Sequence, residues 1–561
     1  MRNPSLRPHW MLVVPLFIVS ASLNAQGVKL PKFFTDKGQT ARFGAAIANL
    51  GDVDGDGIPD LAIGAPLDKT KGLDAGRVDI VSGKTGAKIR THYGTRMGDR
   101  FGNTVAAAGD VDGDRVGDVI VGVGYAGKNL KAGTSATVFS GKTGKQLHRF
   151  VSAKAGDWLG VSVAGPGDLD GDGHADLLVG AFRPGPPVQA GFAVLYSGKT
   201  GKVIRTLTGL GGDYFGWSVG GGGDVDGDGT PDLIVGARNG NHIGSVWAGY
   251  VRVYSGKTGK VLWTLKGDGK HFYFGWSVCI TGDLNGDGRS DLLVGAPGDM
   301  NVGAKRGYAE TFSGKTGRSL FRINGKKDGD HLGFTVAAIG DSNQDGVPDL
   351  LVGAPLGDVN GVQAGYVLGI SGKGPELFTS QGSLAGEEEG SALTGVGDWN
   401  KDGAMDYAIG TSGLVKGSGL VTVHPGKPVP FLQSSPASVS LLRGGKVTFE
   451  IHAPKKHAKK LYILLGSMSG TTPGLKFGGL TLPLNVDAWF WYTAGNPNGL
   501  IQSSLAFLAA DGSGSASLTI PPLSPLSMSG IKMQHAYLVF SLIPTYSVDF
   551  ASNPTETTLT K

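Results

Sequence analysis

Short apolar runs alternate with glycine-containing turns along most of the chain. In one stretch the runs are residues 217–221, 233–237, 250–254 and 260–265, all rich in β-branched or aromatic residues. No apolar period of 3.6 residues, which would indicate helices, is found. Four short strands separated by tight turns are typical of one small antiparallel sheet.

The same layout recurs seven times. Each copy carries the pattern Asp-x-Asp/Asn-x-Asp-x-x-x-Asp between its first and second predicted strands, and successive copies start 56 to 59 residues apart. A period held this closely indicates one supersecondary unit per copy. The sequence therefore predicts an all-β protein with a seven-bladed β-propeller over residues 28–427.

The two ends of the repeat region predict how the ring closes. Residues 28–34 precede Phe43-Gly44 as a fourth strand precedes each later Phe-Gly, whereas the seventh copy ends near residue 427 without a fourth strand of its own. The N-terminal strand is therefore expected to complete the last blade, which would remove two open sheet edges.

Residues 431–561 lack the repeat. Short apolar runs at 446–452, 461–465, 488–492, 504–508 and 536–543 are separated by Gly, Pro and Asn turns. They predict a β-sandwich domain of some eight strands. The segment loosely resembles β-sandwich modules appended to secreted bacterial repeat proteins, and no motif in it indicates a function.

Residues 1–25 have the composition of a signal peptide. Arg2 and Arg7 are followed by an apolar stretch over 10–19 and small residues over 20–25, a stretch too short to span a bilayer stably. The alternative is an uncleaved N-terminal anchor. We expect a secreted or extracellular-surface protein without a transmembrane span in the mature chain. Because Cys279 is the only cysteine, an intrachain disulfide is excluded and another source of stability is needed.

Two further dipeptide and tripeptide motifs keep a fixed order around the acidic pattern. Phe43-Gly44 is followed by Gly64-Ala65-Pro66, and Phe274-Gly275 by Gly295-Ala296-Pro297. In this order and spacing the motifs resemble the FG-GAP repeats of the integrin α-subunit head. Repeats two, four and seven depart from it with Gly122-Val123-Gly124, Gly236-Ala237-Arg238, Gly390-Ser391 and Gly410-Thr411-Ser412. The resemblance implies a propeller whose ligand binds on the face opposite the acidic loops.

The acidic loops have the ligand spacing of a calcium site. In residues 224–232 carboxylates occupy positions 1, 3, 5 and 9, glycine at position 6 permits a sharp turn, and position 7 can add its carbonyl oxygen. An all-oxygen, carboxylate-rich set favours Ca²⁺ over Mg²⁺ and softer metals. The seven loops hold more than half of the 47 Asp and Glu residues, which would repel one another without a cation. The alternative is an acidic turn stabilised only by Asx hydrogen bonds.

The predicted ligand residues, loop by loop, are Asp52, Asp54, Asp56, Ile58 and Asp60; Asp110, Asp112, Asp114 and Asp118; Asp168, Asp170, Asp172, His174 and Asp176; Asp224, Asp226, Asp228, Thr230 and Asp232; Asp283, Asn285, Asp287, Arg289 and Asp291; Asp341, Asn343, Asp345, Val347 and Asp349; and Asp398, Asn400, Asp402, Ala404 and Asp406. Up to one Ca²⁺ per blade is expected. Arg115 replaces a glycine in the second loop and Lys401 adds a positive charge to the seventh, so the Asp110 and Asp398 loops are expected to bind most weakly.

Other motifs carry little chemistry. Ser-Gly-Lys-Thr-Gly recurs at residues 82, 140, 197, 255 and 313 but lacks the earlier glycine and the helix of a phosphate-binding loop, so it is interpreted as a turn between strands. The chain has no His-Glu-x-x-His motif, and an enzyme is not expected. Its formal charge of +5 is scattered, which argues against nucleic-acid binding.

The loops on the face opposite the acidic pattern are irregular, which is where a repetitive scaffold places specificity. The candidate ligand-face residues are Trp158, Tyr214, Trp247, His271, Tyr273 and Arg306. The leading interpretation is a monomeric, calcium-binding propeller that binds an extracellular protein or glycan in an adhesion-like role. The alternatives are a carbohydrate-active enzyme or lectin that uses tryptophans as sugar platforms, and a structural component of an extracellular matrix or wall.

Overall fold

The computed structural model describes residues 32–34 and 41–426, except 124–133, 153, 155, 183–189, 241–246, 270, 299–305, 402 and 414–418, and discontinuous stretches between 432 and 560. The predicted signal peptide and the predicted strand 488–492 lie outside the described residues. The chain divides into two compact units, one formed by Gly27–Pro428 and the other including Val429–Lys561.

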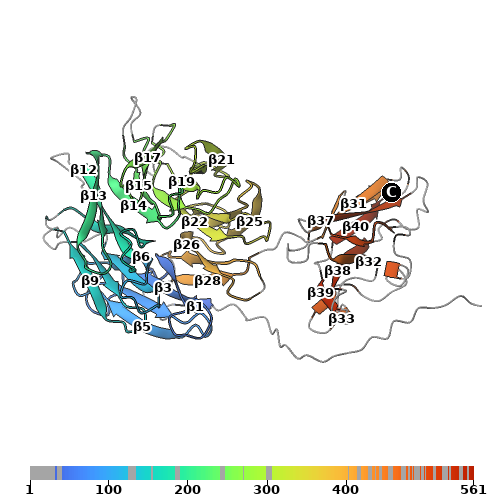
Figure 1. Ribbon diagram of the computed structural model, residues 1–561, viewed down its shortest axis with the longest axis horizontal. Helices are drawn as coiled ribbons and strands as arrows, with labels where there is room; N and C mark the ends of the chain where they lie inside the picture. Colours follow the sequence, from blue (N-terminus) through green and yellow to red (C-terminus); the bar gives the residue numbers. More distant parts are fainter. Residues whose placement is uncertain are drawn as a thin grey trace, which may run out of the picture. The chain divides into compact units, whose positions relative to one another are not determined.

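Seven antiparallel sheets of four strands make up the larger unit, and Figure 1 shows them following one another around a ring. The first four blades are β2–β5 (Ile47–Gly51, Asp60–Ala65, Arg77–Val81, Lys88–Tyr93), β6–β9 (Phe101–Gly109, Asp118–Val123, Ser135–Phe139, Gln146–Val151), β10–β13 (Leu159–Gly167, Asp176–Ala181, Ala190–Tyr196, Val203–Gly211) and β14–β17 (Phe215–Gly221, Leu233–Ala237, Tyr250–Tyr254, Val261–Lys266). The last three are β18–β21 (Ser277–Ile280, Leu292–Ala296, Tyr308–Phe312, Ser319–Asn324), β22–β25 (Thr335–Gly340, Asp349–Ala354, Tyr366–Ile370, Glu376–Gln381) and β26–β28 (Glu389–Gly397, Asp406–Thr411, Leu420–His424) with β1 (Lys32–Phe34). The predicted seven-bladed propeller is confirmed.

The ring closes through the N-terminal strand, as predicted. Strand β1 pairs antiparallel with β28, with Lys32 opposite Thr422 and Phe34 opposite Leu420. Figure 1 shows β1 beside the last blade. An ion pair of 2.7 Å between Arg42 and Glu388 also joins the first and last blades.

The hydrophobic core lies between neighbouring blades. One cluster combines Ile234 and Val251 of the fourth blade with Leu292 and Val294 of the fifth, and all four are fully buried. The second strands carry a glycine where neighbouring blades approach closely. A Cβ on Gly236 would lie 2.2 Å from the carbonyl oxygen of Gly275 in the next blade. This is why glycine recurs in an otherwise apolar strand.

Hydroxyl groups on the first strands tie most blades to their successors. Ser162 Oγ donates to the carbonyl of Gly216 at 2.9 Å, and Ser277 Oγ to that of Gly333 at 2.8 Å. Thr104, Ser218 and Thr335 make the same bond. The corresponding residues of the first and seventh blades are Ala46 and Ala392, which have no hydroxyl. Five of the seven joints therefore carry this hydrogen bond.

The second unit is a β-sandwich, as predicted. One sheet contains β29 (Leu432–Ser435), β31 (Gly445–His452), β37 (Ser513–Ile520) and β35 (Ile501–Gln502). The other contains β30 (Ser438–Ser440), β40 (Thr555–Thr560), β38 (Lys532–Ser541), β32 (Leu461–Ser467) and β36 (Leu505–Phe507), and β39 (Ser547–Ala551) pairs with β38. A separate small hairpin is formed by β33 (Leu475–Phe477) and β34 (Leu480–Leu482). Phe449 and Ile451 of the first sheet pack against Tyr462, Leu464 and Tyr537 of the second. Among the described residues of the whole chain, no helix has the length and apolar character needed to cross a membrane.

Candidate cation sites and ligand face

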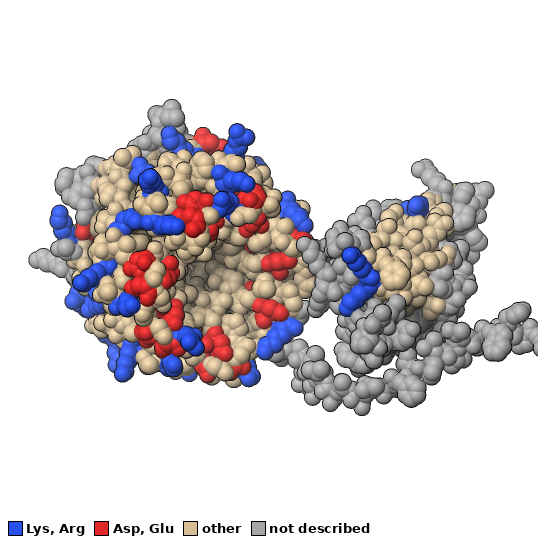
Figure 2. Space-filling view, in the orientation of Figure 1, with Lys and Arg blue, Asp and Glu red and all other residues tan. Residues whose placement is uncertain are grey.

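The acidic loops connect the first and second strands of each blade, and they gather on one face of the ring. Figure 2 shows this acidic face, with Asp and Glu side chains grouped around a central hollow and Lys and Arg mostly farther out. Concentrated negative charge of this kind attracts cations.

The first-position aspartate folds each loop around itself. Asp52 Oδ1 accepts hydrogen bonds from the backbone N–H groups of Gly55 (2.8 Å) and Asp56 (2.9 Å), and Oδ2 accepts one from Gly57 (2.7 Å). Gly57 has a φ of 85°, which glycine adopts without steric cost. The glycine at position 6 therefore makes the sharp backbone turn that the sequence predicts.

The ninth-position aspartate is the buried anchor of the loop. Asp60 is fully buried, and its carboxylate accepts hydrogen bonds from the N–H groups of Val53 (2.7 Å), Asp54 (3.1 Å) and Gly83 (2.9 Å). Gly83 belongs to the turn between the third and fourth strands. The same bond recurs from Gly141 to Asp118, Gly198 to Asp176, Gly256 to Asp232, Gly314 to Asp291, Gly372 to Asp349 and Gly426 to Asp406.

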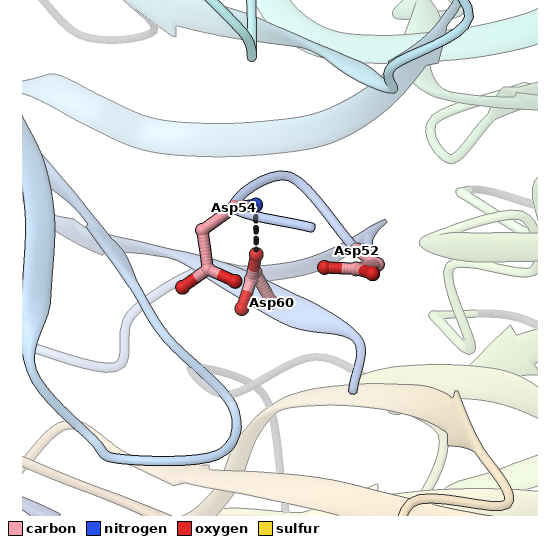
Figure 3. A group of neighbouring side chains, drawn as sticks. All are labelled: Asp52, Asp54 and Asp60. Atoms are coloured by element: carbon pink, nitrogen blue, oxygen red, sulfur yellow. Dashed lines mark hydrogen bonds between the residues drawn. The ribbon is translucent and has the colours of Figure 1, made fainter. Parts of the chain in front are cut away.

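Positions 1, 3 and 9 bring their carboxylates together. In the first loop Asp52, Asp54 and Asp60 offer oxygen atoms within 4.8 Å of one another, and Figure 3 shows Asp60 between the other two. The equivalent groups are Asp110, Asp112 and Asp118; Asp168, Asp170 and Asp176; and Asp224, Asp226 and Asp232. A close set of oxygen donors with a buried member fits a hard divalent cation. These clusters could hold a metal ion.

Position 5 accepts a backbone hydrogen bond from its own loop. Asp56 is outside the group of three, and its Oδ1 accepts the N–H of Ile58 at 3.0 Å. Its place among the ligands, like that of the position-7 carbonyls, stays a prediction.

The loops with asparagine at position 3 engage its amide. Asn285 Nδ2 donates to Asp291 and Asn343 Nδ2 to Asp345. In the seventh loop Asp402 lies outside the described residues. Each of the last three loops has three aspartates in place of four, which lowers its charge.

The unusual residue of the second loop lies where glycine is favoured. Arg115 has a φ of 67°, the left-handed conformation expected for position 6. Lys401 in the seventh loop and Gln344 in the sixth, both at position 4, adopt a φ of 60°. The weaker affinity predicted for the Asp110 and Asp398 loops remains untested.

Burial raises the pKa of the ninth-position carboxyl groups. The pKa values of Asp60, Asp118, Asp176, Asp232 and Asp349 rise to about 6, because loss of water outweighs the backbone hydrogen bonds that favour the charged form. In the absence of a cation, the folded protein therefore takes up these protons more readily than the unfolded chain does.

A pH dependence follows from this direction. Without a cation, the contribution of these groups to stability falls as the pH rises through about 6, whereas a bound cation requires the ionised form. The difference in melting temperature between calcium and chelator should therefore shrink as the pH is lowered from about 7.5 to about 5. Differential scanning calorimetry at several pH values measures this difference; a constant difference over that range would contradict the argument.

Neighbouring acidic loops also contact each other. The N–H of Ala175 donates to the carbonyl of Asp110 at 2.9 Å, and the N–H of Ser290 donates to that of Asp224 at 2.9 Å. The donors occupy position 8 and the acceptors position 1 of the preceding loop. The N–H of Met405 makes the same bond to Asp341 at 3.2 Å, so three pairs of neighbouring loops are connected through backbone atoms.

On the opposite face, the residue before the Phe-Gly position of every repeat has a left-handed backbone. Trp158, Tyr214 and Tyr273 have φ values of 52°, 57° and 54°. The equivalent residues of the other repeats, Arg42, Arg100, His331 and Glu388, have φ values of 51° to 56°, so this conformation belongs to the repeat. Trp158, Tyr214 and Tyr273 place three aromatic side chains at the start of consecutive blades.

Four of the aromatic rings on this face surround Arg238. The guanidinium carbon lies 3.9 Å from the ring centre of Trp217, 4.8 Å from that of Trp276, and 5.1 Å from those of Tyr214 and Tyr273. At these distances the ring faces attract the positive charge. Arg238 therefore joins side chains from the fourth and fifth blades.

Further ring contacts extend this group, which we call the aromatic cluster. Phe182 lies between Trp158 and Tyr214, with centroid distances of 5.1 and 5.0 Å. Trp247 contacts His271 at 5.1 Å and Tyr273 at 6.1 Å. Five of the six predicted ligand-face residues thus gather in one cluster. The sixth, Arg306, is exposed and forms a 2.9 Å ion pair with Asp328.

Sequence reasoning missed the centre of the cluster. Arg238 was noted only as a departure from Gly-Ala-Pro, because it stands where Pro66 and Pro297 stand in other repeats. A charged residue in the place of proline, beside aromatic residues flanking the Phe-Gly motifs, is the signal that would have indicated it.

Comparisons with known proteins agree with the repeat pattern. A family model described as the FG-GAP repeat matches residues 43–81, 160–196, 215–254 and 274–313. Integrin alpha-5 of Xenopus laevis is 29% identical over 232 residues (38% of this chain, 21% of that protein) and integrin alpha-4 of Xenopus laevis 34% over 250 (42% and 23%). Integrin alpha-IIb of Homo sapiens is 32% identical over 236 residues (38% and 21%). The chain therefore covers between 21% and 23% of the length of these relatives.

Among solved structures, a europium-containing methanol dehydrogenase aligns with a TM-score of 0.38 and 11% sequence identity, over 64% of this chain and 79% of that one. A likeness this low says nothing about activity. The repeats, their order and the seven sheets agree with one another. The chain therefore contains FG-GAP repeats within a seven-bladed β-propeller, and its repeat region is similar in sequence to the integrin alpha subunits.

Proposed function

We propose that this chain is a secreted or cell-surface propeller that binds an extracellular protein or glycan through the aromatic cluster, with calcium ions in the acidic loops supporting the ring. The observation that carries the proposal is that Trp158, Tyr214, Trp247, His271 and Tyr273 all belong to the aromatic cluster that contains Arg238 on one face. The similarity to integrin alpha subunits supports an adhesion-type role.

The chemistry of the cluster suits recognition. Tryptophan, tyrosine and arginine carry most of the binding energy at protein interfaces, because they combine a large apolar surface with a polar group. The cluster residues are partly exposed or buried rather than fully exposed. Mutual packing holds the rings in place before a ligand arrives, which reduces the entropy lost on binding.

The proposed cation sites have a supporting role. Asp52, Asp54 and Asp60, and their equivalents in the next three loops, would hold the ion through carboxylate oxygens. A bound divalent cation would supply positive charge that neutralises the repulsion between these groups. The aspartates themselves shape the loop, because the first and ninth positions accept the backbone hydrogen bonds described above.

A binding experiment tests the proposal. The full chain with calcium is exposed to an array of glycans and to extracellular proteins, and the ligand found is titrated against Trp158→Ala and Trp247→Ala. Each variant should weaken binding about tenfold or more, while Val203→Ser, at a 56% exposed site on the outer strand β13, should leave it unchanged.

The same experiment separates the rival functions. Equal affinity of the tryptophan variants and the wild type would place the ligand elsewhere and overturn the proposed face. Binding to glycans alone would identify a lectin, and turnover of a bound polysaccharide would identify an enzyme. A chain that binds neither class would point to a structural role.

A further inference from the structure

The turn between the third and fourth strands contacts the acidic loop of the same blade, at two points in the first, fifth and sixth blades. In the fifth blade this turn is Ser313-Gly314-Lys315. The N–H of Gly314 donates to Asp291 Oδ1 at 2.9 Å, and Ser313 Oγ donates to Asp287 Oδ2 at 3.2 Å. The turn thus holds the ninth- and fifth-position carboxylates.

The lysine of the turn adds a third contact. Lys315 Nζ donates to the carbonyl of Asp287 at 3.5 Å, and Lys84, Lys199 and Lys373 contact the fifth-position carbonyls of their own loops at 3.3 to 3.4 Å. The repeated Ser-Gly-Lys sequence therefore has a common set of partners, which a turn that merely connects strands would not require.

The same turn is held from the other side by the preceding blade. Trp263 on β17 donates its indole N–H to the carbonyl of Gly314 at 2.6 Å, and Arg205 on β13 donates to the carbonyl of Gly256 at 3.0 Å. Arg90 and His148 contact the carbonyls of Gly141 and Gly198 in the same way. Each of these glycines bonds an acidic loop through its N–H and a neighbouring blade through its C=O.

The position of this glycine leaves no room for a side chain. A Cβ on Gly314 would lie 2.0 Å from the carbonyl oxygen of Ser290, at position 8 of the loop, and one on Gly256 would lie 1.9 Å from that of Pro231. Glycine is required here because the turn lies directly on the acidic loop. Movement of the acidic loop therefore displaces the turn, and movement of the turn displaces the loop.

We propose that the Ser-Gly-Lys turn and the donor from the preceding blade are positioning residues of the cation site, so that cation binding in one loop tightens the joint between two blades. This rests on the proposed cation binding. A cation that fixes the ninth-position carboxylate also fixes the turn, because that carboxylate accepts the N–H of the turn glycine. A fixed turn then presents its carbonyl to the donor of the preceding blade. By linkage, the donor must raise cation affinity by the same factor that the cation strengthens the joint.

Hydrogen–deuterium exchange on the full chain tests the coupling in the fifth blade. In the wild type, adding CaCl₂ should slow exchange in the loop 283–291, in the turn 313–317 and in the preceding strand β17. In Trp263→Phe, which keeps an aromatic ring but has no N–H, the response of β17 should be lost. The calcium concentration that half-protects the loop should rise about fivefold.

The sixth blade supplies a matched control. Phe321 occupies the place of Trp263 before this blade and has no N–H to donate, although the turn glycine still bonds Asp349. Phe321→Leu should therefore leave the calcium response of the loop 341–349 unchanged. Arg205→Met repeats the main test at the fourth loop if Trp263→Phe does not fold.

The outcomes distinguish this inference from the function on which it rests. If calcium changes exchange in none of the loops of the wild type, cation binding fails and the coupling fails with it. If the loops respond in Trp263→Phe and Arg205→Met at the wild-type calcium concentration, cation binding stands and the coupling alone is wrong.

Discussion

Removal of divalent cations with a chelator is expected to lower the melting temperature of the propeller by about 10 °C or more. Four loops each bring three carboxylates within 4.8 Å, and without a cation these charges repel one another. Each occupied site stabilises the folded state by about 2.7 kcal/mol at a hundredfold excess of cation over its dissociation constant. With Cys279 as the only cysteine, disulfides within the chain supply none of this stability.

Calorimetric melts in calcium, in chelator and after calcium is restored measure this effect. Restored calcium should recover the original transition, and an equal concentration of magnesium should recover less of it, because Mg²⁺ requires near-octahedral geometry. A melt that is the same in calcium and in excess chelator would disprove a stabilising role for the acidic loops.

The second large effect is expected from Asp232→Ala. This buried carboxylate accepts hydrogen bonds from the N–H groups of Val225 (2.7 Å), Asp226 (3.1 Å) and Gly256 (2.8 Å). Removing it leaves these buried donors without an acceptor, which costs more than the net value of each bond. The free energy of unfolding should fall by about 3 kcal/mol or more, as measured by urea titration.

Asp226→Ala is the matched control in the same loop. Asp226 belongs to the same group of three carboxylates but is only partly buried. Its removal should reduce stability mainly in calcium, whereas the loss in Asp232→Ala should persist in chelator because its hydrogen bonds need no cation. Equal losses for both variants in chelator would mean that the ninth position is not the anchor of the loop.

Features that follow from the repeat could be predicted from the sequence, because every copy marks the same element at the same place and a missing element stands out. The spacing of the acidic loops determined the number of blades, and the missing fourth strand of the last copy predicted the pairing of β1 with β28. The glycine at position 6 indicated a left-handed turn, and Arg115 adopts the same conformation at a φ of 67°.

Features that combine different blades could not be predicted in this way. The rings around Arg238 come from two blades, so no local pattern reports their distances. The Ser-Gly-Lys-Thr-Gly sequence was correctly interpreted as a turn, but its contacts with the acidic loop depend on how the second and third strands bring the two together. That the fifth-position aspartate faces the cation with the others stays a prediction, since Asp56 is seen only to accept backbone and side-chain hydrogen bonds from Ile58 and Ser82.

The uneven distribution of the hydroxyl joints affects how the ring bears mechanical load. Both joints of the first blade lack the hydroxyl donor, since Ala46 and Ala392 stand where the other blades have serine or threonine. Where the ring closes between the last and first blades, the chain has the three paired residues of β1 and the Arg42–Glu388 ion pair instead. A force that pulls on the chain from its N-terminal side would therefore first separate β1 from β28 and then act on the first blade, whose two joints lack the hydroxyl bond that links the other blades.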